Sequence, residues 1–132
     1  MPRTEIDLNR ETVEQLIEKA HEFHTRDDVS FDEEPAIASA DWSRRISDNY
    51  GGDPYYQELR NGIDDLEPDQ QIRLVALMWV GRGDFAADEW ADAVAEAEDR
   101  WNEHTADYLI GTALLADYLG EGLSQLEPGD ED

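Results

Sequence analysis

Glu18, His21 and His24 recur at three-residue intervals near the start of the chain. Residues three apart share one face of a helix, so this spacing can turn a carboxylate and two imidazoles toward one metal ion. A di-iron helical bundle needs a second Glu-x-x-His motif, and the sequence has one copy. The His-Glu-x-x-His spacing of zinc proteases is also missing. Two interpretations stay open: a metal-dependent enzyme that uses these three residues, or a helix end whose histidines complement the helix dipole.

A second group of oxygen-bearing residues lies a few positions further on. Asp28, Ser30 and Asp32 alternate as the first ligands of an EF-hand calcium loop do. That loop requires glycine at its sixth position and glutamate at its twelfth, where this chain has Glu33 and Ser39. The segment therefore does not meet the requirements of an EF-hand.

The tetrapeptide Gly81-Arg82-Gly83-Asp84 resembles a fragment of a phosphate-binding loop. A Walker loop needs a longer glycine spacing with a lysine, and a dinucleotide-binding turn needs a preceding strand and three glycines. We therefore predict a turn between two helices, with Asp84 as the N-cap of the second helix. Arg82 is expected to pair with carboxylates of that helix or to meet an acidic ligand.

No residue can be assigned to catalysis from the sequence. There is no cysteine, no serine in a nucleophile-elbow motif, and His104 is far from the other two histidines. The 34 carboxylates are too many for a general acid and base to be chosen without geometry. We predict no catalytic residue and no cofactor, and favour a function other than an enzyme.

The net charge of the chain limits the classes of partner that it can bind. Thirty-four acidic against ten basic residues give a net charge of −24, and Lys19 is the single lysine. Such a surface repels nucleic acid and anionic lipid and attracts cations and basic proteins. The same composition is expected of a protein adapted to high salt. The N-terminal segment MPRTEIDLNRETVEQ is charged and has no apolar run, so we expect neither a signal peptide nor an anchor, and a cytoplasmic location.

The candidate site residues described above must be positioned by a folded core. The most apolar stretch of the chain is residues 72–80, in which Arg73 is the one polar residue. The stretch is too short to cross a membrane, which takes about 20 apolar residues. Pro68 suits a first helical turn, and Leu, Ala and Met outnumber β-branched residues, so helix is favoured over strand. A helix that is apolar on all sides must be buried. We expect it to end at the glycines of the 81–83 turn.

The rest of the chain is predicted to contain both helices and segments without regular structure. An amphipathic helix is predicted over 9–25, followed by an acidic loop or linker over 26–53, in which a short helix around Trp42 and Ile46 docks on the core. The helical core is predicted over 54–126. It begins at Asp53 and Pro54 as N-cap and N1, and an acidic tail follows over 127–132. The remaining apolar stripes are Tyr55, Leu59, Ile63 and Leu66; Trp90, Val94, Ala97 and Trp101; and Tyr108 to Leu123 with a break at Gly111-Thr112.

Together these elements predict a single domain over residues 1–132. The expected fold is all-α: a compact bundle of about five helices with a buried central helix and a long acidic loop after the first helix.

Three segments of the C-terminal half carry a family resemblance: YQELRNGIDDLEPDQQ, LVALMWVGRGDF and YLIGTALLADYLGEGL. They resemble a family of uncharacterised bacterial proteins, domain of unknown function 3775. Ala113 departs from the pattern, because the family's corresponding string has a proline there. The resemblance implies an all-α domain, and it supplies no activity, substrate or catalytic residue.

The favoured function is a small acidic protein-interaction module. If short neighbours leave part of the central helix uncovered, that face forms an apolar patch, and Met78 and Trp79 are then the expected contacts of a homodimer or target protein. Arg82 and Trp42 are further candidate interaction residues. The alternatives are an acidic decoy or inhibitor of a basic, nucleic-acid-binding protein, and the metal-dependent enzyme described above.

Overall fold

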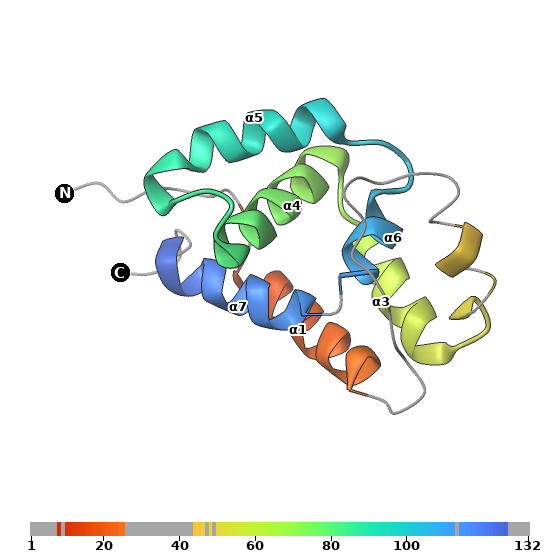
Figure 1. Cartoon of the computed structure of the whole chain (residues 1–132). Helices are drawn as coiled ribbons and strands as arrows, with labels where there is room; N and C mark the ends of the chain where they lie inside the picture. The colour runs from red at the N-terminus through yellow and green to blue at the C-terminus, as the bar shows by residue number, and fades with distance from the viewer. Residues whose placement is uncertain are drawn as a thin grey trace.

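The structure is a computed structural model that describes residue 8 and residues 10–25, 44–46, 48, 50–112 and 114–126. The described residues contain helices and no strand, which confirms the predicted all-α fold (Figure 1). Residues 44–46, 48 and 50 are also helical. The principal elements are α1 (Arg10–His24), α3 (Pro54–Asp64), α4 (Pro68–Arg82), the 3-10 turn η1 (Ala87–Glu89), α5 (Trp90–Arg100), α6 (Thr105–Ile110) and α7 (Leu115–Leu126).

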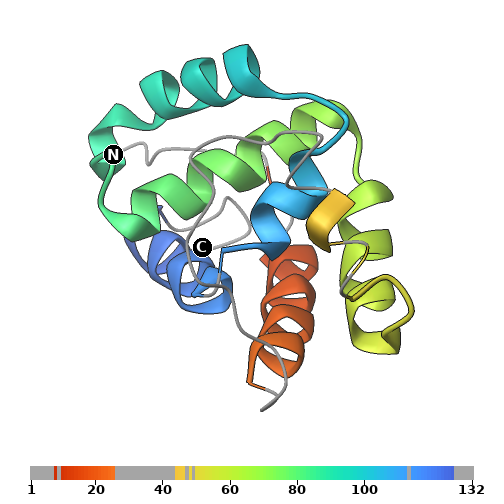
Figure 2. The same cartoon turned by 45° about the vertical axis from the view of Figure 1, so that its right-hand side comes forward.

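Helix α4 is the buried centre of the fold, as its composition predicts. Every residue from Leu74 to Val80 is at most 7% exposed. The helix lies between α5 and α7 and also contacts α6, so neighbours cover all of its sides (Figure 1, Figure 2). Each buried Leu or Val side chain contributes roughly 1.5–3 kcal/mol relative to an exposed one. None of the described helices combines the length and apolar character that crossing a bilayer requires.

Two glycines bring α4 and α7 into backbone contact. A Cβ atom on Gly81 would overlap the carbonyl oxygen of Tyr118, and one on Gly122 would lie 2.6 Å from the carbonyl oxygen of Leu77. Gly81 is therefore part of α4 and serves its packing, so its predicted role in ending the helix is wrong. Gly83 alone ends α4: it has a φ of 97° and donates its amide to the carbonyls of Trp79 and Val80.

The predicted N-cap at Asp84 is also wrong. The next helical turn starts at Ala87, and the amide of Ala86 donates to Glu89 Oε1 at 2.8 Å. Asp84 instead accepts hydrogen bonds from Arg82. The cap predicted for α3 does form, because the Asp53 carboxylate accepts from the amides of Tyr55 and Tyr56 at 2.8 and 3.3 Å.

The buried face of α3 differs from the predicted stripe in its first residue. Tyr55 is 45% exposed, and Tyr56 is the residue that turns inward with Leu59 and Ile63. In α1, Phe23 is fully buried together with Val13, Leu16 and Ala20. The spacing of Tyr56, Leu59 and Ile63 is three and then four residues, which matches a helical face as well as the predicted stripe did.

The region after α1 is described in part. Ile46 lies in a helical segment and is 3% exposed, so it packs into the core as predicted. Trp42, most of the acidic loop and the 127–132 tail lie outside the described residues.

We expect Gly81→Ala to destabilise the protein by about 3 kcal/mol, because an added methyl group would meet the α7 backbone, which cannot move aside cheaply. Gly120→Ala is the matched control: it lies within α7 with no atom within 4 Å of the added carbon. There we expect a gain of about 0.5–1 kcal/mol. Urea unfolding measures both free energies. Similar stabilities for the two variants would contradict the close packing of α4 on α7.

Candidate functional site

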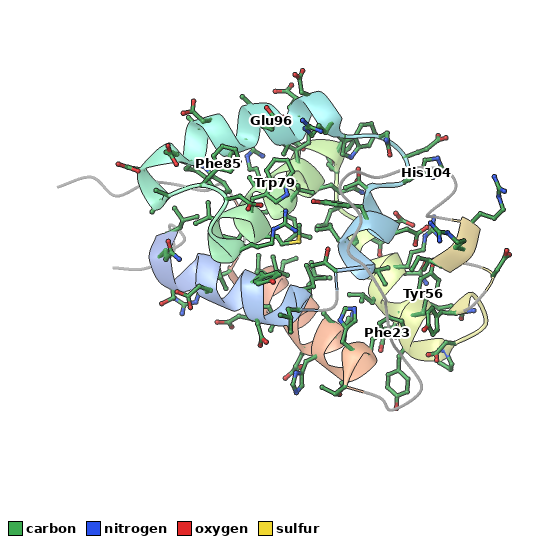
Figure 3. All side chains as sticks on the ribbon, viewed as in Figure 1. Phe23, Tyr56, Trp79, Phe85, Glu96 and His104 are labelled. Carbon is green, nitrogen blue, oxygen red and sulfur yellow. The ribbon has the colours of Figure 1, made fainter. Side chains whose placement is uncertain are left out.

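An open pocket of about 360 Å³ lies between the end of α4, the turn that follows it and the C-terminal half of α5. Figure 3 shows three of its residues, each from a different element: Trp79 of α4, Phe85 of the turn and Glu96 of α5. The pocket combines aromatic, basic and acidic side chains. We call it the α4–α5 pocket, and its lining residues are Trp79, Arg82, Asp84, Phe85, Glu96 and Arg100.

Trp79 and Phe85 form the aromatic floor of this pocket. Their ring centroids are 5.9 Å apart and their planes differ by 28°, so the two rings are stacked. The indole Nε1 of Trp79 donates to the hydroxyl of Tyr108 on α6 at 2.9 Å. Because Trp79 is 7% exposed, Phe85 presents more of the aromatic surface to solvent. The floor is thus held in place by α4, α6 and the turn together.

Two ion pairs form the charged rim. Arg82 donates from Nε and Nη2 to Asp84 Oδ2 at 2.9 and 2.7 Å, and Arg100 donates from Nε to Glu96 Oε2 at 2.6 Å. Desolvation lowers the pKa of Arg82, but the hydrogen bond to Asp84 and the proximity of Tyr108 outweigh it, so the pKa is raised. The rim therefore carries two positive and two negative charges that balance locally.

Arg82 thus pairs with a carboxylate of the turn, two residues away, whereas the sequence predicted either carboxylates of the following helix or an acidic ligand. Glu96 of that helix does line the same pocket. The four-residue spacing of Glu96 and Arg100 predicts that they form an ion pair on one face of a helix. It gives no sign that this pair lies near Trp79, because that proximity depends on how α5 packs on α4.

A buried polar cluster joins α3 to α6 on another side of the molecule. Asp107 is completely buried and accepts from the Tyr56 hydroxyl at 2.7 Å and from Arg60 Nη1 at 3.0 Å. Arg60 also donates to the Tyr56 hydroxyl at 2.9 Å. Burial and the hydrogen bond to Asp107 raise the pKa of Tyr56 to about 12. The sequence gives no sign of this cluster, because Asp107 is 47 residues from Arg60.

We expect Asp107→Ala to lower the free energy of unfolding by about 3 kcal/mol, because it removes the partner of a partly buried cation and of a buried hydroxyl. Asp64→Ala is the control, since it removes the exposed carboxylate that the same arginine contacts at 3.2 Å. An exposed pair of this kind contributes less than about 1 kcal/mol. Urea unfolding compares the variants, and equal losses would show that the α3–α6 cluster is not a main support of the fold.

Comparison with known proteins adds one finding. The family model "Protein of unknown function (DUF3775)" matches residues 56–127, more than half of the chain. The chain belongs to the DUF3775 family. No curated protein and no solved structure matches it. All six lining residues of the α4–α5 pocket lie inside the DUF3775 segment, as do Tyr56, Arg60 and Asp107. The α1 histidines lie outside it.

The metal candidates on α1 do not converge. Glu18 and His21 are exposed, whereas half-buried His24 has its Nε2 2.7 Å from the carbonyl oxygen of Ile110 on α6. In the described part of this DUF3775 protein, no three His, Asp or Glu side chains are grouped to hold a metal ion. Metal binding at α1 stays a prediction, and elemental analysis of untagged, chelator-free protein tests it.

The candidate interaction residues differ in how accessible they are to a partner. Met78 is completely buried, so no partner can reach it in the folded chain. The apolar patch that an uncovered face of α4 would form is absent from the described surface, because α5, α6 and α7 enclose the helix. Because α4 presents no such patch among the described residues, the structure does not support the homodimer predicted to form there. Trp79 and Arg82 do line the α4–α5 pocket, and Trp42 lies outside the described residues.

His24 makes stability depend on pH. Desolvation lowers its pKa in the folded state, and hydrogen bonds to backbone carbonyls oppose this in part. Below a pH of about 6.5 the unfolded chain takes up the proton before the folded chain does, so stability falls as the pH drops through this range. We expect His24→Gln to lose less stability than the natural protein between neutral and mildly acidic pH, as measured by urea unfolding. His21→Gln is the exposed control, and an equal effect of both substitutions would contradict this role of His24.

Proposed function

We propose that the protein is a binding module and that its α4–α5 pocket receives a side chain from a basic segment of a partner protein. The observation that carries this proposal is the combination of an aromatic floor with two carboxylates, Asp84 and Glu96, at one exposed pocket. Cations bind favourably to aromatic faces and carboxylates, and neither interaction requires a catalytic group.

The net charge of the whole chain determines which sign of charge the partner carries. The lining charges cancel in pairs, so the long-range field at the pocket is set by the net charge of −24. A field of this sign speeds the approach of basic segments and repels acidic ones. The described residues of η1 and α5 contribute to this field, with exposed carboxylates at Asp88, Glu89, Asp92, Glu98 and Asp99.

The size and openness of the pocket favour a side chain over a free small molecule. Small-molecule sites are clefts of about 300–1,000 Å³ that bury most of the ligand. This pocket is at the lower end of that range and is open to solvent. An anchoring side chain needs less enclosure, because the rest of the partner segment contacts the acidic surface of η1 and α5.

Calorimetric titration with a short arginine–glycine repeat peptide tests the proposal. We expect binding that weakens steeply with ionic strength, since screening removes the attraction of the acidic surface. Glu96→Gln should weaken binding about two- to fivefold, the contribution of one exposed ion pair. The control Asp117→Asn removes an exposed carboxylate from α7 and should have a smaller effect.

Two results would contradict the proposal. Equal weakening by Glu96→Gln and Asp117→Asn would mean that the peptide senses net charge and not the pocket. Preferential binding of a glutamate–glycine repeat peptide would mean that Arg82 and Arg100 form an anion site instead.

A further inference from the structure

We infer that the side chain received by the α4–α5 pocket is an arginine, whose guanidinium group lies on the aromatic floor and hydrogen-bonds to Asp84 and Glu96. This inference rests on the proposed function and specifies the chemistry of the partner. A lysine has the same charge, so the distinction depends on the shape and hydration of the cation.

The aromatic floor favours a flat cation. Of the two stacked rings of the floor, Phe85 is more exposed than Trp79. A guanidinium group is planar and weakly hydrated, so it stacks on an aromatic face with little loss of hydration. The ammonium of lysine is compact and strongly hydrated, and an open pocket does not compensate for removing its water.

The rim offers acceptors that suit a guanidinium group. The arginines of the chain already show this geometry, since two N–H groups of Arg82 reach one oxygen of Asp84. The contacts at 2.7 and 2.6 Å use Oδ2 of Asp84 and Oε2 of Glu96, and a carboxylate has about four acceptor positions. The other acceptor positions of these two carboxylates can therefore receive N–H donors of an incoming guanidinium group while the internal pairs stay in place.

Arg82 and Arg100 position these acceptors. Each holds its carboxylate by a short ion pair, and Arg82 is also close to Tyr108, which accepts the hydrogen bond of Trp79. Floor and rim are thus connected through α6. Pre-ordered groups lose less entropy when a ligand binds, which offsets part of the repulsion between like cations.

The experiment compares two peptides of equal length and charge, an arginine–glycine and a lysine–glycine repeat, by calorimetric titration of the full chain. We expect the arginine peptide to bind about two- to fivefold more tightly, the range of an exposed cation–aromatic contact. Phe85→Leu keeps an apolar side chain but removes the ring, so it should abolish this preference. Circular dichroism and urea unfolding establish that each variant is folded.

The outcomes separate the inference from the proposed function. Equal affinity for the two peptides, with both weakened by Glu96→Gln, overturns the arginine inference and leaves the binding module standing. A preference for arginine that survives Phe85→Leu also overturns it, because stacking would not be its cause. If neither Glu96→Gln nor Phe85→Leu weakens binding more than Asp117→Asn, the pocket itself is excluded. Should Phe85→Leu fail to fold, the peptide comparison and Glu96→Gln still decide.

Discussion

The close approach of α4 and α7 is the constraint on which the rest of the structure depends. Gly81 and Gly122 let the two backbones touch, and no larger residue fits at Gly81 without moving the helices apart. This contact covers one side of an apolar helix that α5 and α6 cover elsewhere. Because so much apolar surface is buried in α4, its position determines where the neighbouring helices lie.

The pocket follows from the way α4 ends. Gly83 adopts a left-handed conformation that reverses the chain after Arg82, and Phe85 then folds back on Trp79. Tyr108 ties the Trp79 indole to α6, and α5 brings Glu96 and Arg100 to the same place. The proposed binding surface is therefore built on a helix whose residues 74–80 are all buried, which gives it a rigid base.

Tyr56, Asp107 and His24 have structural roles in this DUF3775 protein. Asp107 and Tyr56 join α3 to α6, and His24 contacts the last carbonyl of α6. Such groups hold helices together, and none of them lines the α4–α5 pocket. The pocket presents aromatic rings and paired charges, and the proposed recognition of a basic segment depends on these groups.

The sequence by itself determined the all-α fold, the buried helix over residues 72–80, the cap at Asp53 and the acidic surface, because local periodicity, capping chemistry and composition express these directly. Its family resemblance was confirmed over residues 56–127. Only the tertiary structure decided that Gly81 is a packing residue, that Tyr56 replaces Tyr55 in the core and that Met78 is enclosed. It also decided which charged residues meet at Trp79 and Phe85, and that Asp107 pairs with Arg60. These features are contacts between helices distant in sequence, and periodicity within one helix carries no information about the neighbour that will cover it.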